Sequence, residues 1–121
     1  MQPRSLVALY HAVGRPDMTG YRDALPADRL ERQFAWLKRH YRVLPLEELV
    51  ERRRQGRSLD GLAALTFDDN HRTVLDLALP LAAALDLPAT WFLIGAPLRG
   101  RPFWRDLVRR IEASGEVEAF L

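Results

Sequence analysis

The 121-residue sequence contains no cysteine and no long apolar run. The first absence excludes disulfide bonds and thiolate metal ligands, and it leaves the redox compartment undetermined. Residues 1–5 lead into a short apolar stretch that ends at Tyr10. That stretch is too short for the apolar region of a signal peptide and far too short for a membrane span. We therefore expect no membrane span and a cytoplasmic location.

The sequence also lacks a strong excess of charge of one sign. It has 18 basic and 16 acidic side chains, and Lys38 is the only lysine. The sequence pI of about 9.5 reflects this excess of arginine rather than a basic patch. The one basic run, Arg52–Arg54, is typical of a solvated helix face. Because nucleic-acid binding usually needs clustered Lys and Arg, we expect no nucleic-acid partner.

The most informative stretch is Leu62–Asn70, an apolar run that ends in two adjacent carboxylates, Asp68 and Asp69. The run predicts a buried parallel strand, and in α/β proteins ligands bind beyond the carboxyl ends of such strands. Neighbouring strand residues point to opposite faces, so both carboxylates can serve one site only if the backbone turns here. Asn70 favours that turn. The alternative is that these polar residues only cap the following helix.

Strands and helices are predicted to alternate along the rest of the chain. Leu30, Phe34, Leu37 and Tyr41 recur at helical spacing, and Pro80 is expected to kink or split the helix after the central strand. Leu107, Val108 and Ile111 are expected to face inward from the last helix. The predicted strands are 6–10, 42–44, 62–67 and 89–94, and the predicted helices are 27–40, 46–55, 73–85 and 103–113.

This alternation predicts an α/β protein with parallel strands joined by right-handed crossovers. Four such β/α units amount to about half of a (β/α) barrel. Half a barrel has two open sheet edges, so we expect the chain alone either to self-associate through these edges or to be only marginally stable. Five residues are predicted to share one core: Phe34, Leu37, Leu65, Phe67 and Leu93.

The order of these motifs resembles the polysaccharide deacetylase family, that is, the NodB-homology domain of carbohydrate esterase family 4. The resemblance implies an irregular TIM-like barrel, of which residues 1–121 form a partial domain. The matching stretches are Tyr10–Val13, Gln33–Phe34 with Leu37, Tyr41–Leu49, Thr66–Asp69, Leu77–Leu81, Leu87–Gly95 and Phe103–Trp104.

The resemblance implies hydrolysis of an N-acetyl group from an amino sugar in a glycan. In the family the first Asp of the TFDD motif is the general base and the second is a metal ligand. Carried to this sequence, Asp68 would take a proton from a metal-bound water and Asp69 would hold the metal. A divalent cation, zinc by expectation, suits this reaction because it polarises the amide oxygen and lowers the pKa of bound water.

The second motif of the family, which supplies two imidazole ligands, is absent. The chain has only three histidines, His11, His40 and His71, and none of their spacings matches that motif. A catalytic zinc normally has three protein ligands, so zinc is expected to bind weakly or not at all here. The alternative function is a non-catalytic half-barrel that serves as a structural or interaction module. A third possibility is another hydrolase or phosphotransfer domain that uses the same Asp pair.

Two further residues are candidates for the substrate-binding or supporting layer of the site. His11 ends the first strand on the side where the carboxylates emerge, and its alternative role is a hydrogen bond to the nearby loop. Trp104 lies near a loop and is the best candidate for stacking on a sugar ring. His71 is predicted to face solvent in the first turn of a helix, and its alternative role is to approach the metal. His40 is predicted to close a helix without a catalytic role.

Overall fold

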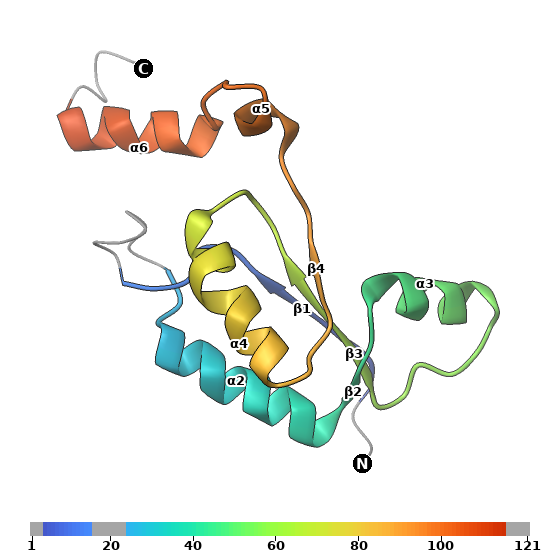
Figure 1. Cartoon of the computed structure of the whole chain (residues 1–121). Coiled ribbons are helices and arrows are strands. Elements are labelled where there is room, and N and C mark those ends of the chain that lie inside the picture. The colour runs from blue at the N-terminus through green and yellow to red at the C-terminus, as the bar shows by residue number, and fades with distance from the viewer. Residues whose placement is uncertain (1–3, 16–23, 116–121) are drawn as a thin grey trace.

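The computed structural model of the chain describes residues 4–15 and 24–115. Strands and helices alternate within these ranges, as the sequence predicts (Figure 1). None of the helices in these ranges is long and apolar enough to cross a membrane. The elements are β1 (Leu6–Tyr10), α2 (Ala27–His40), β2 (Arg42–Val43), α3 (Leu46–Arg54), β3 (Leu62–Phe67), the π-helical segment η1 (Val74–Ala78), α4 (Leu79–Ala84), β4 (Ala89–Trp91), α5 (Gly95–Leu98) and α6 (Trp104–Ser114).

The four strands form one parallel sheet in which β3 is central. β1 pairs with β3 along its whole length, from Leu6 opposite Ala63 to Tyr10 opposite Phe67. On its other side β3 pairs first with β2 and then, nearer its carboxyl end, with β4. The predicted parallel α/β class is therefore confirmed. Because β1 lies beside β3 and not beside β2, the sheet departs from the sequential strand order of a regular barrel.

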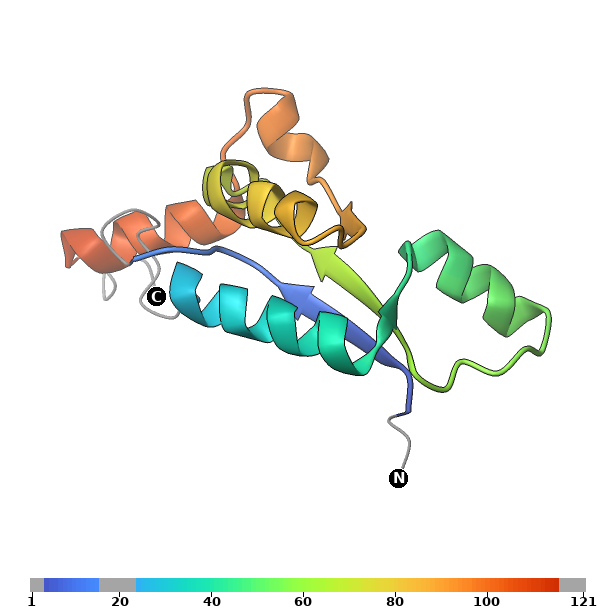
Figure 2. The ribbon, with the colours of Figure 1, turned by 60° about the horizontal axis from the view of Figure 1, so that its bottom comes forward.

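Every residue of β3 is buried, because side chains pack against both of its faces. Ala63, Leu65 and Phe67 belong to the main core, which α2, η1 and α4 cover. Leu62 and Ala64 point the other way and pack with residues of α3. Figure 2 shows α2 and α4 over one part of the sheet and α3 apart from them. This burial on two faces explains why β3 reads as a continuous apolar run.

Helix α2 buries the apolar face that its sequence spacing predicts, namely Leu30, Phe34 and Leu37. Phe34 stands edge-on to Tyr10 and Phe67, with ring centroids 5.8 and 6.4 Å apart. Such contacts contribute about 0.5 to 1.5 kcal/mol beyond the area they bury. This aromatic cluster fixes α2 against β1 and β3.

The helix after β3 changes character at Pro80, as predicted. The segment Val74–Ala78 has wider π-helical turns, and α4 begins at Leu79 with Pro80 in its first turn. Proline has no N–H to donate, and the first turn of an α-helix needs none. The proline is therefore accommodated where the two kinds of helical turn meet.

Two predictions about the fourth strand are wrong. The strand was expected over residues 89–94, but β4 ends at Trp91. Leu93 lies beyond that end and is 55% exposed, so it does not belong to the core. The other predicted core residues are at most 3% exposed: Phe34, Leu37, Leu65 and Phe67.

The last helix, α6, forms close to where it was predicted but does not pack as expected. Leu107 and Val108 are 42% and 39% exposed, and Ile111 is only partly buried. Figure 1 shows α6 beyond the carboxyl ends of the strands rather than on a face of the sheet. An apolar helical face is visible in a sequence, but what covers it is not.

Candidate active site

The carboxylate pair follows the carboxyl end of the central strand. Asp68 and Asp69 come directly after β3, and His11 comes directly after β1, the parallel neighbour of β3. The three residues therefore lie together at the carboxyl ends of the strands. Ligands bind beyond these ends in open α/β sheets.

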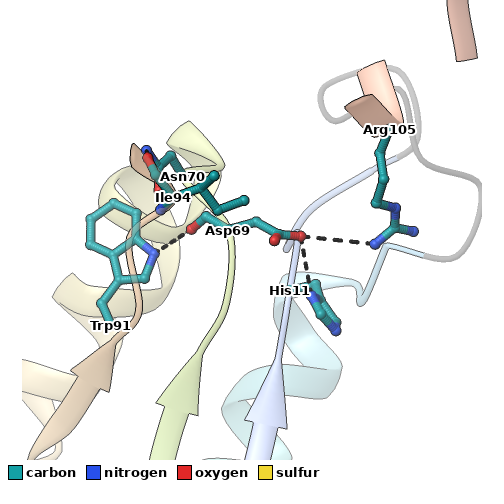
Figure 3. Close-up of polar contacts among 6 residues, drawn as sticks. All are labelled: His11, Asp69, Asn70, Trp91, Ile94 and Arg105. Carbon is teal, nitrogen blue, oxygen red and sulfur yellow. Dashed lines mark hydrogen bonds and ion pairs between the residues drawn. The ribbon is translucent and has the colours of Figure 1, made fainter. Parts of the chain in front are cut away.

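The carboxylate of Asp69 contacts two groups that can carry positive charge (Figure 3). Its Oδ2 atom lies 3.3 Å from Nδ1 of His11 and 3.8 Å from Nη1 of Arg105, a residue of α6. The side chain of Asp69 is 21% exposed, compared with 48% for His11 and 34% for Arg105. The carboxylate is thus partly withdrawn from solvent and is reached from β1 on one side and from α6 on the other.

The turn that brings Asp69 to this place is made by Asp69 itself. Its φ is 65°, in the left-handed region. The sequence favoured Asn70 for this turn, and that detail is corrected. Aspartate and asparagine enter the left-handed region more readily than most residues, although a non-glycine residue still loses about 1 to 2 kcal/mol there.

Asn70 and Trp91 hold the turn rather than make it. The Asn70 amide donates to the carbonyl oxygen of Ile94 at 2.9 Å and accepts from the Ile94 N–H at 2.7 Å. The indole N–H of Trp91 donates to the carbonyl oxygen of Asp69 at 2.6 Å. The side chain of Thr73, the N-cap residue of η1, makes no capping hydrogen bond to the backbone of that segment. These contacts argue against the alternative that the polar residues only cap a helix.

Asp68 keeps the backbone pairing of the strand. Its N–H donates to the carbonyl oxygen of Tyr10 at 2.9 Å, and its side chain is partly buried. The two carboxylates therefore differ in their surroundings: Asp69 has turned out of the sheet, whereas Asp68 still belongs to it.

A cleft of about 550 Å³ opens beside Asp69. Trp104 forms part of its wall and is 64% exposed, with its indole edge-on to Phe103 at a centroid distance of 5.8 Å. Asp68 is not among the described residues that line this cleft. The lining residues are His11, Asp69, Ile94, Ala96, Pro102, Phe103, Trp104 and Arg105.

The other two histidines differ in their surroundings: His71 lines a second cavity, of about 400 Å³, together with His11 and Arg105, whereas His40 lies at the end of α2. Nδ1 of His71 is 2.8 Å from the hydroxyl oxygen of Thr73, which also accepts a hydrogen bond from the Val13 N–H. His71 is partly buried rather than solvent-facing, so it differs from the prediction in exposure. His40 stacks on Trp36 at a centroid distance of 4.6 Å, at the end of α2.

Comparison with known protein families matches residues 55–119 to the polysaccharide deacetylase family model. The matched segment begins directly after α3, includes the carboxylate pair and extends past α6. The chain belongs to the polysaccharide deacetylase family.

Among curated proteins, this polysaccharide deacetylase chain is similar to the poly-beta-1,6-N-acetyl-D-glucosamine N-deacetylase of Staphylococcus epidermidis. The two are 35% identical over 63 residues, which is 51% of this chain and 22% of that protein. The chain therefore spans only about a fifth of the length of this relative.

Two solved structures share the fold. One is a de-N-acetylase from Aggregatibacter actinomycetemcomitans, with a TM-score of 0.68 and 24% identity over 93% of this chain and 52% of that one. The other is the Streptococcus pyogenes deacetylase PplD in complex with acetate, with a TM-score of 0.60 and 22% identity over 79% of this chain and 44% of that one. This polysaccharide deacetylase chain thus spans about half of each.

The donor set at Asp69 partly fits the metal that the family resemblance implies. Carboxylate and imidazole are both ligands that Zn²⁺ accepts, and a catalytic zinc takes three protein ligands. In the part of the chain that the structure describes, no group of three His, Cys, Asp or Glu side chains is placed to hold a metal ion. The described residues therefore fit the beginning of a zinc shell and not a complete one.

Sequence reasoning missed Arg105, and it missed the contacts that Trp91 and Asn70 make at this site. Arg105 belongs to no motif that we recognised in the sequence. Its contact with Asp69 depends on the position of α6, which the sequence pattern does not predict. Trp91 lies in a predicted strand, but the partner of its indole N–H depends on the turn at Asp69. Asn70 was identified as a turn residue, but its pairing with Ile94 across the two loops has no signal in the sequence.

Proposed function

We propose that the chain is the part of a metal-dependent polysaccharide N-deacetylase that carries the TFDD carboxylates. The observation that supports this most is the placement of Asp69. It sits at the carboxyl end of the central strand, in contact with His11 and facing a cleft with an exposed Trp104. Its membership of the polysaccharide deacetylase family adds the reaction class.

The proposed substrate is an N-acetylated amino-sugar polysaccharide. The name of the Staphylococcus epidermidis relative specifies a polymer of N-acetylglucosamine. An exposed indole at the wall of a cleft suits such a substrate, because an aromatic face can pack against the apolar face of a sugar ring. Trp104 is the proposed stacking residue.

The proposed roles divide the two carboxylates. Asp69 would hold the divalent metal, zinc by expectation, and Asp68 would take the proton of the attacking water. The metal, when bound, would polarise the amide carbonyl and lower the pKa of water. His11 would orient the Asp69 carboxylate through its hydrogen bond, since metal-binding carboxylates are usually held by such partners. The described residues supply too few ligands for a zinc shell and the sequence lacks the imidazole pair of the family, so we expect this chain to bind zinc weakly.

The test is to compare Asp69→Ala with Asp68→Asn. In the 121-residue chain, calorimetric titration should show weak zinc binding that Asp69→Ala removes and Asp68→Asn retains. Acetate release from chito-oligosaccharide should be near background for the chain alone. In a longer chain that supplies the missing ligands, Asp68→Asn should keep the metal and lose most turnover. If Asp68→Asn lost the metal and Asp69→Ala kept it, the two roles would have to be exchanged.

The alternative is a non-catalytic module that associates through its sheet. The face of β1 opposite α2 favours it, because Val7 and Leu9 are 49% and 54% exposed there. Exposed apolar side chains beside an open strand edge promote pairing with another chain. A complete zinc-binding motif in a longer form of the protein would favour the enzyme over the module.

A further inference from the structure

The chain segments after β3 and β4 stay joined although the backbone of one of them has left the sheet. The N–H of Phe92 donates to the carbonyl oxygen of Phe67 at 2.8 Å, which extends the backbone pairing past Trp91. Two residues after Phe67 the backbone turns at Asp69, where φ is 65°. A strand that turns in this way can no longer present its N–H and C=O groups to its neighbour in register.

Side chains replace the lost backbone partners (Figure 3). An amide side chain offers an acceptor and a donor, as a peptide unit does. The Asn70 amide uses both on Ile94, at 2.7 and 2.9 Å, so it pairs with Ile94 as a strand residue would. The Trp91 indole N–H satisfies the carbonyl oxygen of Asp69 at 2.6 Å. Each residue thus joins the segment after β3 to the segment around the end of β4.

We infer that Trp91 and Asn70 are positioning residues that hold Asp69 in its left-handed conformation and so aim its carboxylate at His11 and the cleft. A non-glycine residue at positive φ persists only where its surroundings determine it. Here one bond fixes the carbonyl of Asp69 itself, and two bonds fix the next residue. Only the purpose of the aimed carboxylate rests on the proposed function, since the restraint is a property of the fold.

This inference predicts what happens when the restraint is removed without touching Asp69. Asp69 should then relax toward negative φ, and Oδ2 should move away from the position 3.3 Å from Nδ1 of His11. The loss of one typical hydrogen bond changes the ratio of the two conformations about fivefold. Trp91→Phe removes only the indole donor and keeps an aromatic ring. Asn70→Ala removes both bonds to Ile94 and changes no aromatic ring.

The primary test records the ring resonances of His11 by NMR in the 121-residue chain, with Asp69→Asn as the reference for a lost carboxylate. In Trp91→Phe and Asn70→Ala these resonances should move toward their positions in Asp69→Asn. Trp36→Phe is the matched control, because it makes the same change at an indole on α2 and should leave the His11 resonances in place. Resonances of His11 that coincide with wild type in both positioning variants would overturn the inference.

A zinc titration separates this inference from the proposed function. If Asp69 is the metal ligand, both positioning variants should bind zinc more weakly than wild type and Trp36→Phe. The loss should reach at most about fivefold for Trp91→Phe, which removes one hydrogen bond, and at most about 30-fold for Asn70→Ala, which removes two. If wild type and Asp69→Asn bound zinc equally, Asp69 would not be the metal ligand. The His11 resonances alone would then test whether Trp91 and Asn70 position Asp69. Zinc binding lost in Asp69→Asn but unchanged in both positioning variants would contradict the positioning role alone. Zinc affinity is measured at a temperature where every variant is folded. If the loss of zinc affinity only followed the decrease in melting temperature across the variants, that result would also count against the positioning role.

Discussion

Replacing Leu37 by alanine is expected to destabilise the chain more than any exposed substitution on the helices. Leu37 is 3% exposed and belongs to the core that α2 forms on the sheet. Removing its isobutyl group loses the transfer free energy of the buried methyl and methylene groups, about 0.8 kcal/mol for each CH₂. The cavity left behind adds to this loss, which brings the expected decrease in the free energy of unfolding to about 2 to 5 kcal/mol.

The assay is urea unfolding followed by circular dichroism, with Leu75→Ala as the control. Leu75 lies on η1 and is 54% exposed, so the same change there should cost no more than about 0.5 kcal/mol. The unfolding midpoint of Leu37→Ala should fall with little change in the slope, because the surface exposed on unfolding is nearly the same. Equal midpoints for the two variants would refute the packing of α2 described above.

Two further predictions concern Tyr10 and self-association. Burial raises the pKa of the Tyr10 hydroxyl above its ordinary value of 10.0, so the folded chain keeps this proton at a pH where the unfolded chain loses it. Stability should therefore fall as pH rises through about 10, and Tyr10→Phe should show a smaller fall in unfolding experiments between pH 9 and 11. Light scattering should show concentration-dependent self-association that Leu9→Lys reduces, because a charge on an exposed strand opposes edge pairing; a monomer at all concentrations would contradict this.

The parts of the fold that periodicity controls could be predicted from the sequence. Leu30, Phe34 and Leu37 specify the buried face of α2 because helical spacing puts them on one side. The uninterrupted apolar run of β3 specifies burial on both faces. Pro80 specifies where the following helix changes because its ring forbids an interior hydrogen bond. Each of these features depends on residues close together in the chain.

The errors arise where distant residues decide the local structure. Leu93 belongs to an apolar run that is typical of a strand. The strand β4 nevertheless ends before Leu93, because the chain after its neighbour β3 turns away at Asp69. The next contacts are then made by Asn70 to Ile94 rather than by one backbone to another. The hydrophobic pattern of the sequence does not predict where side-chain hydrogen bonds take the place of backbone hydrogen bonds. Both the end of β4 and the exposure of Leu93 therefore follow from one turn that the pattern does not reveal.

The same reasoning applies to the site. The TFDD motif identifies Asp68 and Asp69 as chemical groups, but their different surroundings come from the φ of a single residue. In a regular strand the two carboxylates would point to opposite faces and could not serve one cleft. The turn at Asp69 frees its carboxylate to meet His11 and Arg105, while the backbone of Asp68 stays paired with Tyr10. The backbone therefore gives the adjacent aspartates different surroundings, and the side chains that contact the turn, Trp91 and Asn70, lie on β4 and just beyond β3.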